Sequence, residues 1–129
     1  MKPEELLYAP THEWVFVDEA EGVATIGISA FAVEQLTDLV YIELPDVGTQ
    51  VTAGESFGEI ESVKAVSDLY SPVTGKIIAV NNDLVDALET FSSDPYGAGW
   101  VAKVKIQDKS SLTKLLDHSA YAAQCAEEG

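Results

Sequence analysis

The sequence feature that most limits the fold is a pair of short alternating runs on either side of residues 61–64. Residues 56–60 and 65–70 alternate between apolar and polar or small side chains, and four residues separate them. Alternation of this kind, interrupted by so short a connection, predicts a β-hairpin. Side chains at a hairpin turn reach into water because no second layer covers them. The sequence therefore predicts that Lys64 presents a primary amine at the tip of a rigid finger.

An exposed lysine in a turn is usually only a solubilising charge. Three features favour a functional role for Lys64. The chain has no arginine and only seven lysines, and the tip lacks glycine, asparagine and proline, the usual turn residues. The apolar Val63 and Ala65 flank the lysine, while the acidic Glu61 and Asp68 stand before and after it. The pattern indicates a tip that another protein recognises.

Length and charge limit the classes of protein to which the chain can belong. Its 129 residues suffice for one domain with a core, and a hydrophobic fraction of 47% excludes a disordered tail. A formal net charge of -15 repels nucleic-acid phosphate and anionic lipid and favours partners with basic faces. No apolar run approaches transmembrane length. We therefore expect neither a nucleic acid nor a membrane as a partner.

The first nine residues predict the compartment. They carry Glu4 and Glu5 and lack both the basic start of a signal peptide and the arginine-rich character of a transit peptide. The chain is expected to be cytoplasmic in a bacterium or, if it is a mature processed form, to lie in the mitochondrial matrix.

The sequence shows no catalytic or metal-binding constellation. His12 and His118 are too few and too far apart to predict a metal site, and the single Cys125 is expected to be a structural thiol in a helix. There is no glycine-rich phosphate loop and no nucleophile beside a base. An enzyme with an acid/base pair hidden among the 22 carboxylates is a weaker alternative, and a passive interaction module is a third.

The periodicity predicts a mostly β fold. Expected strands are residues 14–17, 22–28, 39–44, 56–60, 65–70, 76–80 and 100–106, with a loop over 45–54. Expected helices are residues 30–36 with Ser29 as N-cap, 84–91, and one last helix that begins near 110. Many short strands with turns every eight to twelve residues are typical of a sandwich or flattened barrel, with the helices at its edge.

The tip sequence Glu-Ser-Val-Lys-Ala-Val-Ser-Asp at residues 61–68 resembles the lipoylation site of the glycine cleavage system H-protein family. Tips of biotin carriers read Met-Lys-Met, and most lipoyl domains of 2-oxo acid dehydrogenases read Asp-Lys-Ala. The resemblance extends to residues 11–14, 23–28, 40–45, 71–75 and 94–100. It implies a single domain over 1–129 with the barrel-sandwich hybrid fold of lipoyl and biotinyl carriers. The lipoyl-like core would cover about 23–105 and a C-terminal helical extension about 110–127.

The resemblance also implies a function. The chain would be a carrier and not an enzyme, with lipoate amide-linked to Lys64 by a lipoate ligase or lipoyl transferase. The rest of the tip would serve in recognition: Glu61, Ser62, Val63, Ala65, Val66, Ser67 and Asp68. The arm, with a reach of about 12–15 Å, would carry the aminomethyl group of glycine between two enzymes. These are the pyridoxal-phosphate glycine decarboxylase (P protein) and the tetrahydrofolate-dependent aminomethyltransferase (T protein). A dihydrolipoyl dehydrogenase (L protein) would reoxidise the arm. The alternative is an H-like protein that relays lipoyl groups to other lipoyl domains.

Chemistry further predicts a shelter for the loaded arm. An aminomethyl thioether exposed to water would lose its amine readily, and the amine is cationic. The shelter should therefore combine an apolar wall with carboxylates or hydroxyls. Thr11, Glu13 and Asp68 are the candidates for its polar side; the alternative is that Glu13 and Asp68 are only solvated surface charges.

Overall fold

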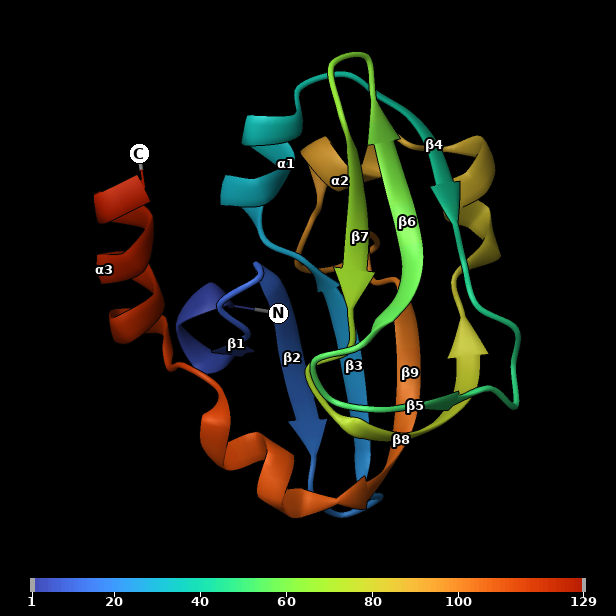
Figure 1. Cartoon of the computed structure of the whole chain (residues 1–129), viewed down its shortest axis with the longest axis vertical. Helices are drawn as coiled ribbons and strands as arrows, with labels where there is room; N and C mark the ends of the chain where they lie inside the picture. Colours follow the sequence, from blue (N-terminus) through green and yellow to red (C-terminus); the bar gives the residue numbers. More distant parts are fainter. Residues whose placement is uncertain (1, 129) are drawn as a thin grey trace.

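The computed structural model describes residues 2–128, which form two antiparallel sheets with short helices at their edges (Figure 1). The larger sheet has the strand order β1-β2-β3-β9-β8-β5 and the smaller one the order β4-β6-β7. The strands are β1 Leu7–Tyr8, β2 Glu13–Asp18, β3 Val23–Ile28, β4 Leu39–Glu43, β5 Gln50–Val51, β6 Ser56–Ser62, β7 Val66–Tyr70, β8 Thr74–Val80 and β9 Ala102–Asp108. The helices are α1 Ala30–Leu36, α2 Thr90–Ser93 and α3 His118–Glu128, with 3-10 turns η1 Pro3–Glu5, η2 Asn82–Asp86 and η3 Lys109–Lys114.

The core fills the space between the two sheets. On the larger sheet, alternate residues of β3 and β9, such as Ile26 and Val104, turn inward and are almost fully buried. Ile42, Ile60 and Leu69 of the smaller sheet belong to the same core cluster. A sheet with one buried face needs this period of two, which is why the alternation in the sequence predicted these strands. The result is the mostly β sandwich that the sequence predicted.

Trp14 holds strands β2 and β3 together. Its ring is 0% exposed and lies on Gly27 of β3, its partner in the β2–β3 register. A Cβ at position 27 would overlap the indole, so only glycine lets the strand accept this ring. The indole N–H donates to the carbonyl of Pro95 at 2.9 Å, which ties the 94–100 loop to β2.

Several predicted elements are confirmed, and others differ in detail; the last predicted strand, 100–106, runs from Ala102 to Asp108. Helix α1 begins after Ser29, whose hydroxyl accepts from the N–H of Ala32, as the N-cap prediction requires. The 45–54 loop contains the two-residue strand β5, too short to show any periodicity. The predicted 84–91 helix is divided into η2 and α2, and Leu84 and Phe91, one in each, are the buried anchors.

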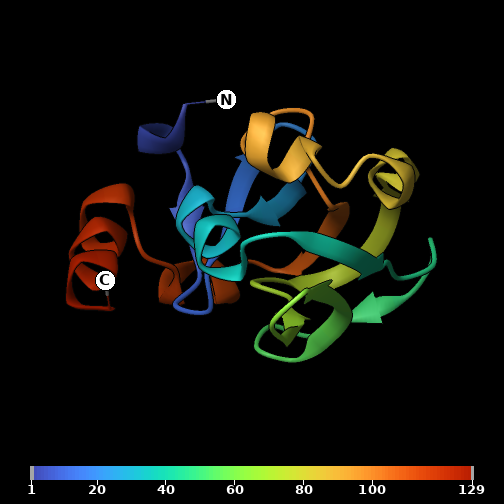
Figure 2. The ribbon, with the colours of Figure 1, turned by 90° about the horizontal axis from the view of Figure 1, so that it is seen from above.

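The C-terminal segment also differs from the prediction of one continuous helix. Asp108 caps the short 3-10 turn η3, the chain then extends through Leu116, which pairs with Tyr8, and α3 begins only at His118. The leucines at helical spacing predicted one helix, because the periodicity of a sequence does not show which backbone groups pair with a distant strand. Helix α3 lies beside the sheets and outside α1 when the molecule is viewed from above (Figure 2).

Candidate functional site

Lys64 lies at the turn between β6 and β7, which projects beyond the body at the upper end of the molecule (Figure 1). Lys64, Ala65, Val63 and Val66 are all exposed, the two valines at 67% and 61%. Within residues 2–128, Lys64 takes part in no ion pair, so its amine is presented without a carboxylate partner. The hairpin predicted from the sequence is confirmed.

Ser62 explains how the tip turns without glycine, asparagine or proline. Its side chain is buried, and its Oγ accepts from the backbone N–H groups of Lys64 at 3.3 Å and Ala65 at 3.1 Å. Its own N–H donates to the carbonyl of Ala65 at 2.8 Å. A serine hydroxyl that forms hydrogen bonds with nearby backbone groups stabilises a turn. The tip therefore turns without a glycine. The N–H of Val63 donates to the carbonyl of Asp38, which fixes the tip to the segment that follows α1.

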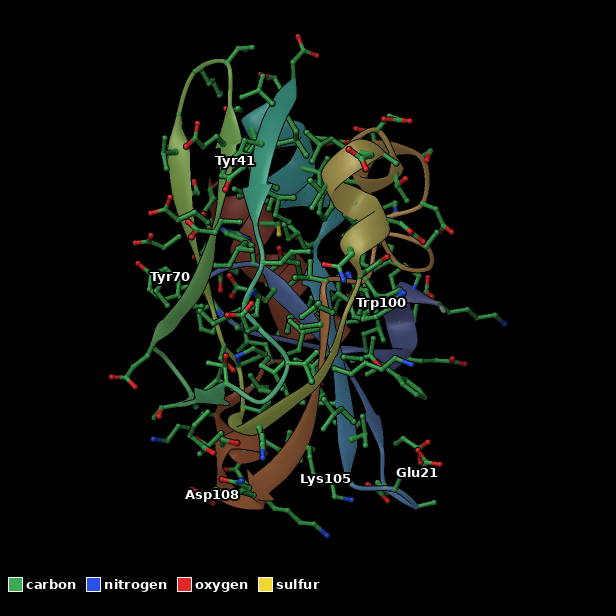
Figure 3. The ribbon with its side chains drawn as sticks, turned by 90° about the vertical axis from the view of Figure 1, so that its right-hand side faces the viewer. Glu21, Tyr41, Tyr70, Trp100, Lys105 and Asp108 are labelled. Carbon is green, nitrogen blue, oxygen red and sulfur yellow. The ribbon has the colours of Figure 1, made fainter. Side chains whose placement is uncertain are left out.

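The edge strand β4 adds apolar surface near the tip. Its register with β6 shifts between Leu39 and Tyr41, so Val40 and Tyr41 are both exposed where strict alternation would turn one of them inward. Figure 3 shows Tyr41 in the half of the molecule that carries the tip, while Glu21, Lys105 and Asp108 lie at the other end. The tip end thus presents apolar side chains around a lone amine. Of the predicted recognition residues, Glu61 lies opposite Val66 in the hairpin.

A cavity of about 290 Å³ lies beside this hairpin, between α1, β7, the beginning of β2 and the end of α3. All three predicted shelter residues, Thr11, Glu13 and Asp68, line it, together with Ser67. The remaining lining residues are His12, Ile28, Phe31, Ala32, Gln35, Leu36, Ile60, Leu69 and Glu128. Sequence reasoning missed these, although the amphipathic pattern of 30–36 could have pointed to α1 as an apolar wall.

Glu13 is not a solvated surface charge. It is 3% exposed; its Oε1 accepts from the hydroxyl of Thr11, and its Oε2 accepts from the N–H of Tyr70 at 3.2 Å. Burial raises the pKa of Glu13 from 4.5 to about 7, against the smaller lowering effects of these hydrogen bonds. Asp68, by contrast, is exposed at the cavity wall, so the solvated-charge alternative is wrong for Glu13 alone.

Among residues 2–128, no group of three or more histidine, cysteine or acidic side chains is arranged to hold a metal ion. Cys125 lies half-buried in α3 beside the Tyr8–Tyr121 cluster. No helix in the described part of the chain is long and apolar enough to cross a membrane.

Comparison with known proteins decides between a carrier, an enzyme and a passive interaction module. The sequence profile of the family described as glycine cleavage H-protein matches residues 6–128. The chain belongs to this family. A glycine cleavage system H protein of Rhodopirellula baltica is 56% identical over 129 residues, which cover 98% of this chain and 97% of the relative. One from a Cyanothece species is 55% identical over 122 residues, covering 95% and 93%.

A solved structure agrees in fold. The crystal structure of a glycine cleavage system H protein from Mycobacterium marinum superposes with a TM-score of 0.88 at 43% identity, covering 97% of this chain and 99% of that one. The chain therefore has the barrel-sandwich fold of lipoyl carriers and is a carrier protein of glycine cleavage and not an enzyme. The relatives favour this role over the lipoyl-relay alternative.

Proposed function

We propose that Lys64 is the lipoyl attachment site and that the arm carries the aminomethyl group of glycine between enzymes. The observation that carries the proposal is an unpaired, exposed amine at the tip of a hairpin whose outgoing strand leads to a cavity. Ser67, which lines that cavity, is three residues beyond Lys64, which is at most about 10 Å along the chain. A lipoyl-lysine arm of about 12–15 Å reaches that far.

The cavity suits such an arm. Ile28, Phe31, Leu36 and Ile60 provide apolar walls for a hydrocarbon chain, and Thr11, Glu13 and Asp68 provide a polar side. When attached, the lipoyl group supplies the disulfide that accepts the aminomethyl group and the length to carry it. The chain's own residues supply the shelter, because a carrier that exposes its load to water loses it.

Glu13 is the residue that would bind the cationic amine of the load. With a pKa of about 7, Glu13 is protonated in about half of the molecules near pH 7, and a cation that enters the cavity favours the ionised form at little cost. A neutral acid avoids an unpaired buried charge in the unloaded state. Thr11 and the Tyr70 N–H keep the carboxyl oriented in both states.

Partners and compartment follow from the same proposal. The glycine decarboxylase, the aminomethyltransferase and the dihydrolipoyl dehydrogenase would each receive the arm, and a lipoate ligase or lipoyl transferase would attach it. The residues around Lys64, from Glu61 to Asp68, would be read by the attaching enzyme, because that enzyme must reach the amine itself. The relatives from Rhodopirellula baltica and Idiomarina loihiensis are bacterial proteins, which favours the cytoplasm as the compartment.

The attachment site is tested by replacing Lys64 with arginine, which keeps the charge and removes the nucleophilic amine. After treatment with a lipoate ligase, intact mass should show one lipoyl addition for the parent and none for Lys64→Arg. Lys76→Arg, at an exposed lysine of β8, is the matched control and should accept lipoate as the parent does. A lipoyl addition to Lys64→Arg would refute the assignment.

The shelter has a test of its own. Glu13→Ala should speed ammonia release from the loaded carrier, with no partner present, by about tenfold or more, since a charge-assisted hydrogen bond contributes about 1.5–3 kcal/mol. Lipoylation of Lys64 should be unchanged. An ammonia release rate equal to that of the parent would show that Glu13 does not shelter the load.

A further inference from the structure

His12, which stands between the shelter residues Thr11 and Glu13, has a left-handed backbone. Its φ is +82°, a conformation that residues other than glycine adopt in only a few per cent of cases, although histidine adopts it more often than most. Its N–H donates to Ala9 at 2.9 Å, and its carbonyl accepts from the N–H of Ser29 at 2.9 Å. This bend ends the 9–12 turn, begins β2 and brings the Thr11 hydroxyl onto the Glu13 carboxylate.

Helix α3 contacts the side chain of His12. The hydroxyl of Tyr121 lies 2.6 Å from Nδ1 of His12, and Oε1 of Glu128 lies 3.1 Å from Nε2. Tyr121 and Glu128 are seven residues apart, two turns along one face of α3, so both reach the same imidazole. Phe31 of α1 packs against the ring from another side, with centroids 5.3 Å apart.

The two residues of α3 that contact His12 are themselves held in place by further contacts. Tyr121 is buried, its ring stacks on Tyr8 at 4.3 Å, and its hydroxyl lies 2.6 Å from the hydroxyl of Ser29. Burial raises the pKa of Tyr121, so its hydroxyl stays protonated and can donate to Nδ1. Gln124 donates to Oε2 of Glu128 at 2.7 Å and to the carbonyl of Pro10 at 2.8 Å, which leaves Oε1 for the N–H at Nε2.

We propose that His12 is a positioning residue and that α3 is its clamp, with Tyr121 and Glu128 holding the imidazole so that the left-handed bend keeps Thr11 and Glu13 together on the cavity wall. The inference rests on the proposed shelter for its functional consequence. It gives the C-terminal helix a task in the carrier beyond the place of Glu128 in the cavity wall, since α3 would also act on the load through the backbone conformation of His12.

The conformational part of the clamp is tested on the unmodified protein. In the double variant Tyr121→Phe/Glu128→Ala, the ring contacts of residue 121 with Tyr8 and His12 remain, while both side-chain hydrogen bonds to His12 are lost. NMR should show His12 leaving the left-handed region, through a weaker intraresidue HN–Hα NOE and altered Cα and Cβ shifts. Tyr121→Phe/Glu127→Ala is the matched control for the second change, because Glu127 is the adjacent exposed glutamate and has no resolved contact with His12; it should shift less. A His12 backbone unchanged in both variants would overturn the proposal.

The functional part uses the lipoylated and loaded carrier. Tyr121→Phe/Glu128→Ala should speed ammonia release about three- to tenfold, the loss expected for one or two hydrogen bonds. In a His12→Gly background the same pair of changes should have no further effect, because glycine adopts a positive φ without a clamp. An equal effect in both backgrounds would overturn the proposal that α3 acts through His12. If the NMR shifts occur but neither this variant nor Glu13→Ala alters release, the clamp stands and the shelter is refuted.

Discussion

The raised pKa of Glu13 predicts a measurable dependence of stability on pH. An isolated glutamate ionises near pH 4.5, whereas buried Glu13 ionises near pH 7. Between these values the unfolded chain loses a proton that the folded chain keeps, so this residue's contribution to stability is fully present below pH 4.5 and is lost as the pH rises through 7. One pKa unit corresponds to about 1.4 kcal/mol, so the loss approaches about 3 kcal/mol above pH 8.

Glu13→Gln isolates this contribution, since glutamine has the same shape and never ionises. Its oxygen can still accept from Tyr70, and its amide can still bind the Thr11 hydroxyl. Urea unfolding from pH 5 to 8 should show the variant gaining about 2–3 kcal/mol relative to the parent as the pH rises. The comparison with the parent removes the effect of the other carboxylates. Stability curves for variant and parent that run parallel over this range would refute the reasoning. Carbon-13 NMR of the Glu13 carboxyl would give the same pKa directly.

Two further predictions concern packing and charge. Gly27→Ala places a methyl group against the buried Trp14 ring and should lower the free energy of unfolding by about 1–3 kcal/mol in urea titrations, and an unchanged midpoint would show that the ring can move aside. Because the net charge of -15 should steer the approach to the glycine decarboxylase, the association rate should fall as the salt concentration rises. The physical reason is screening, since charges interact over only about 8 Å at physiological ionic strength. A stopped-flow association rate that does not change with salt would exclude steering by this surface.

Much of the fold was predictable because it depends on local pattern. The alternation on both sides of residues 61–64 predicted the hairpin, and Ser29 followed by an amphipathic run predicted α1. The divided C-terminal segment was not predictable, since the pairing of Leu116 with Tyr8 joins residues more than a hundred positions apart. Leucine spacing reports which side chains are apolar and does not report which backbone groups find a distant partner.

The candidate site, like the fold, was predictable from the sequence only in part. The sequence by itself determined the exposed amine at Lys64, because a short connection between two strands must turn in solvent, and it determined which polar residue types a cationic load would require. Only the tertiary structure decided that Glu13 is buried beside Thr11 with its pKa near 7, and that His12 is held by α3. Burial and backbone strain depend on what the folded chain places around a residue, and those neighbours come from strands and helices that are distant in the sequence.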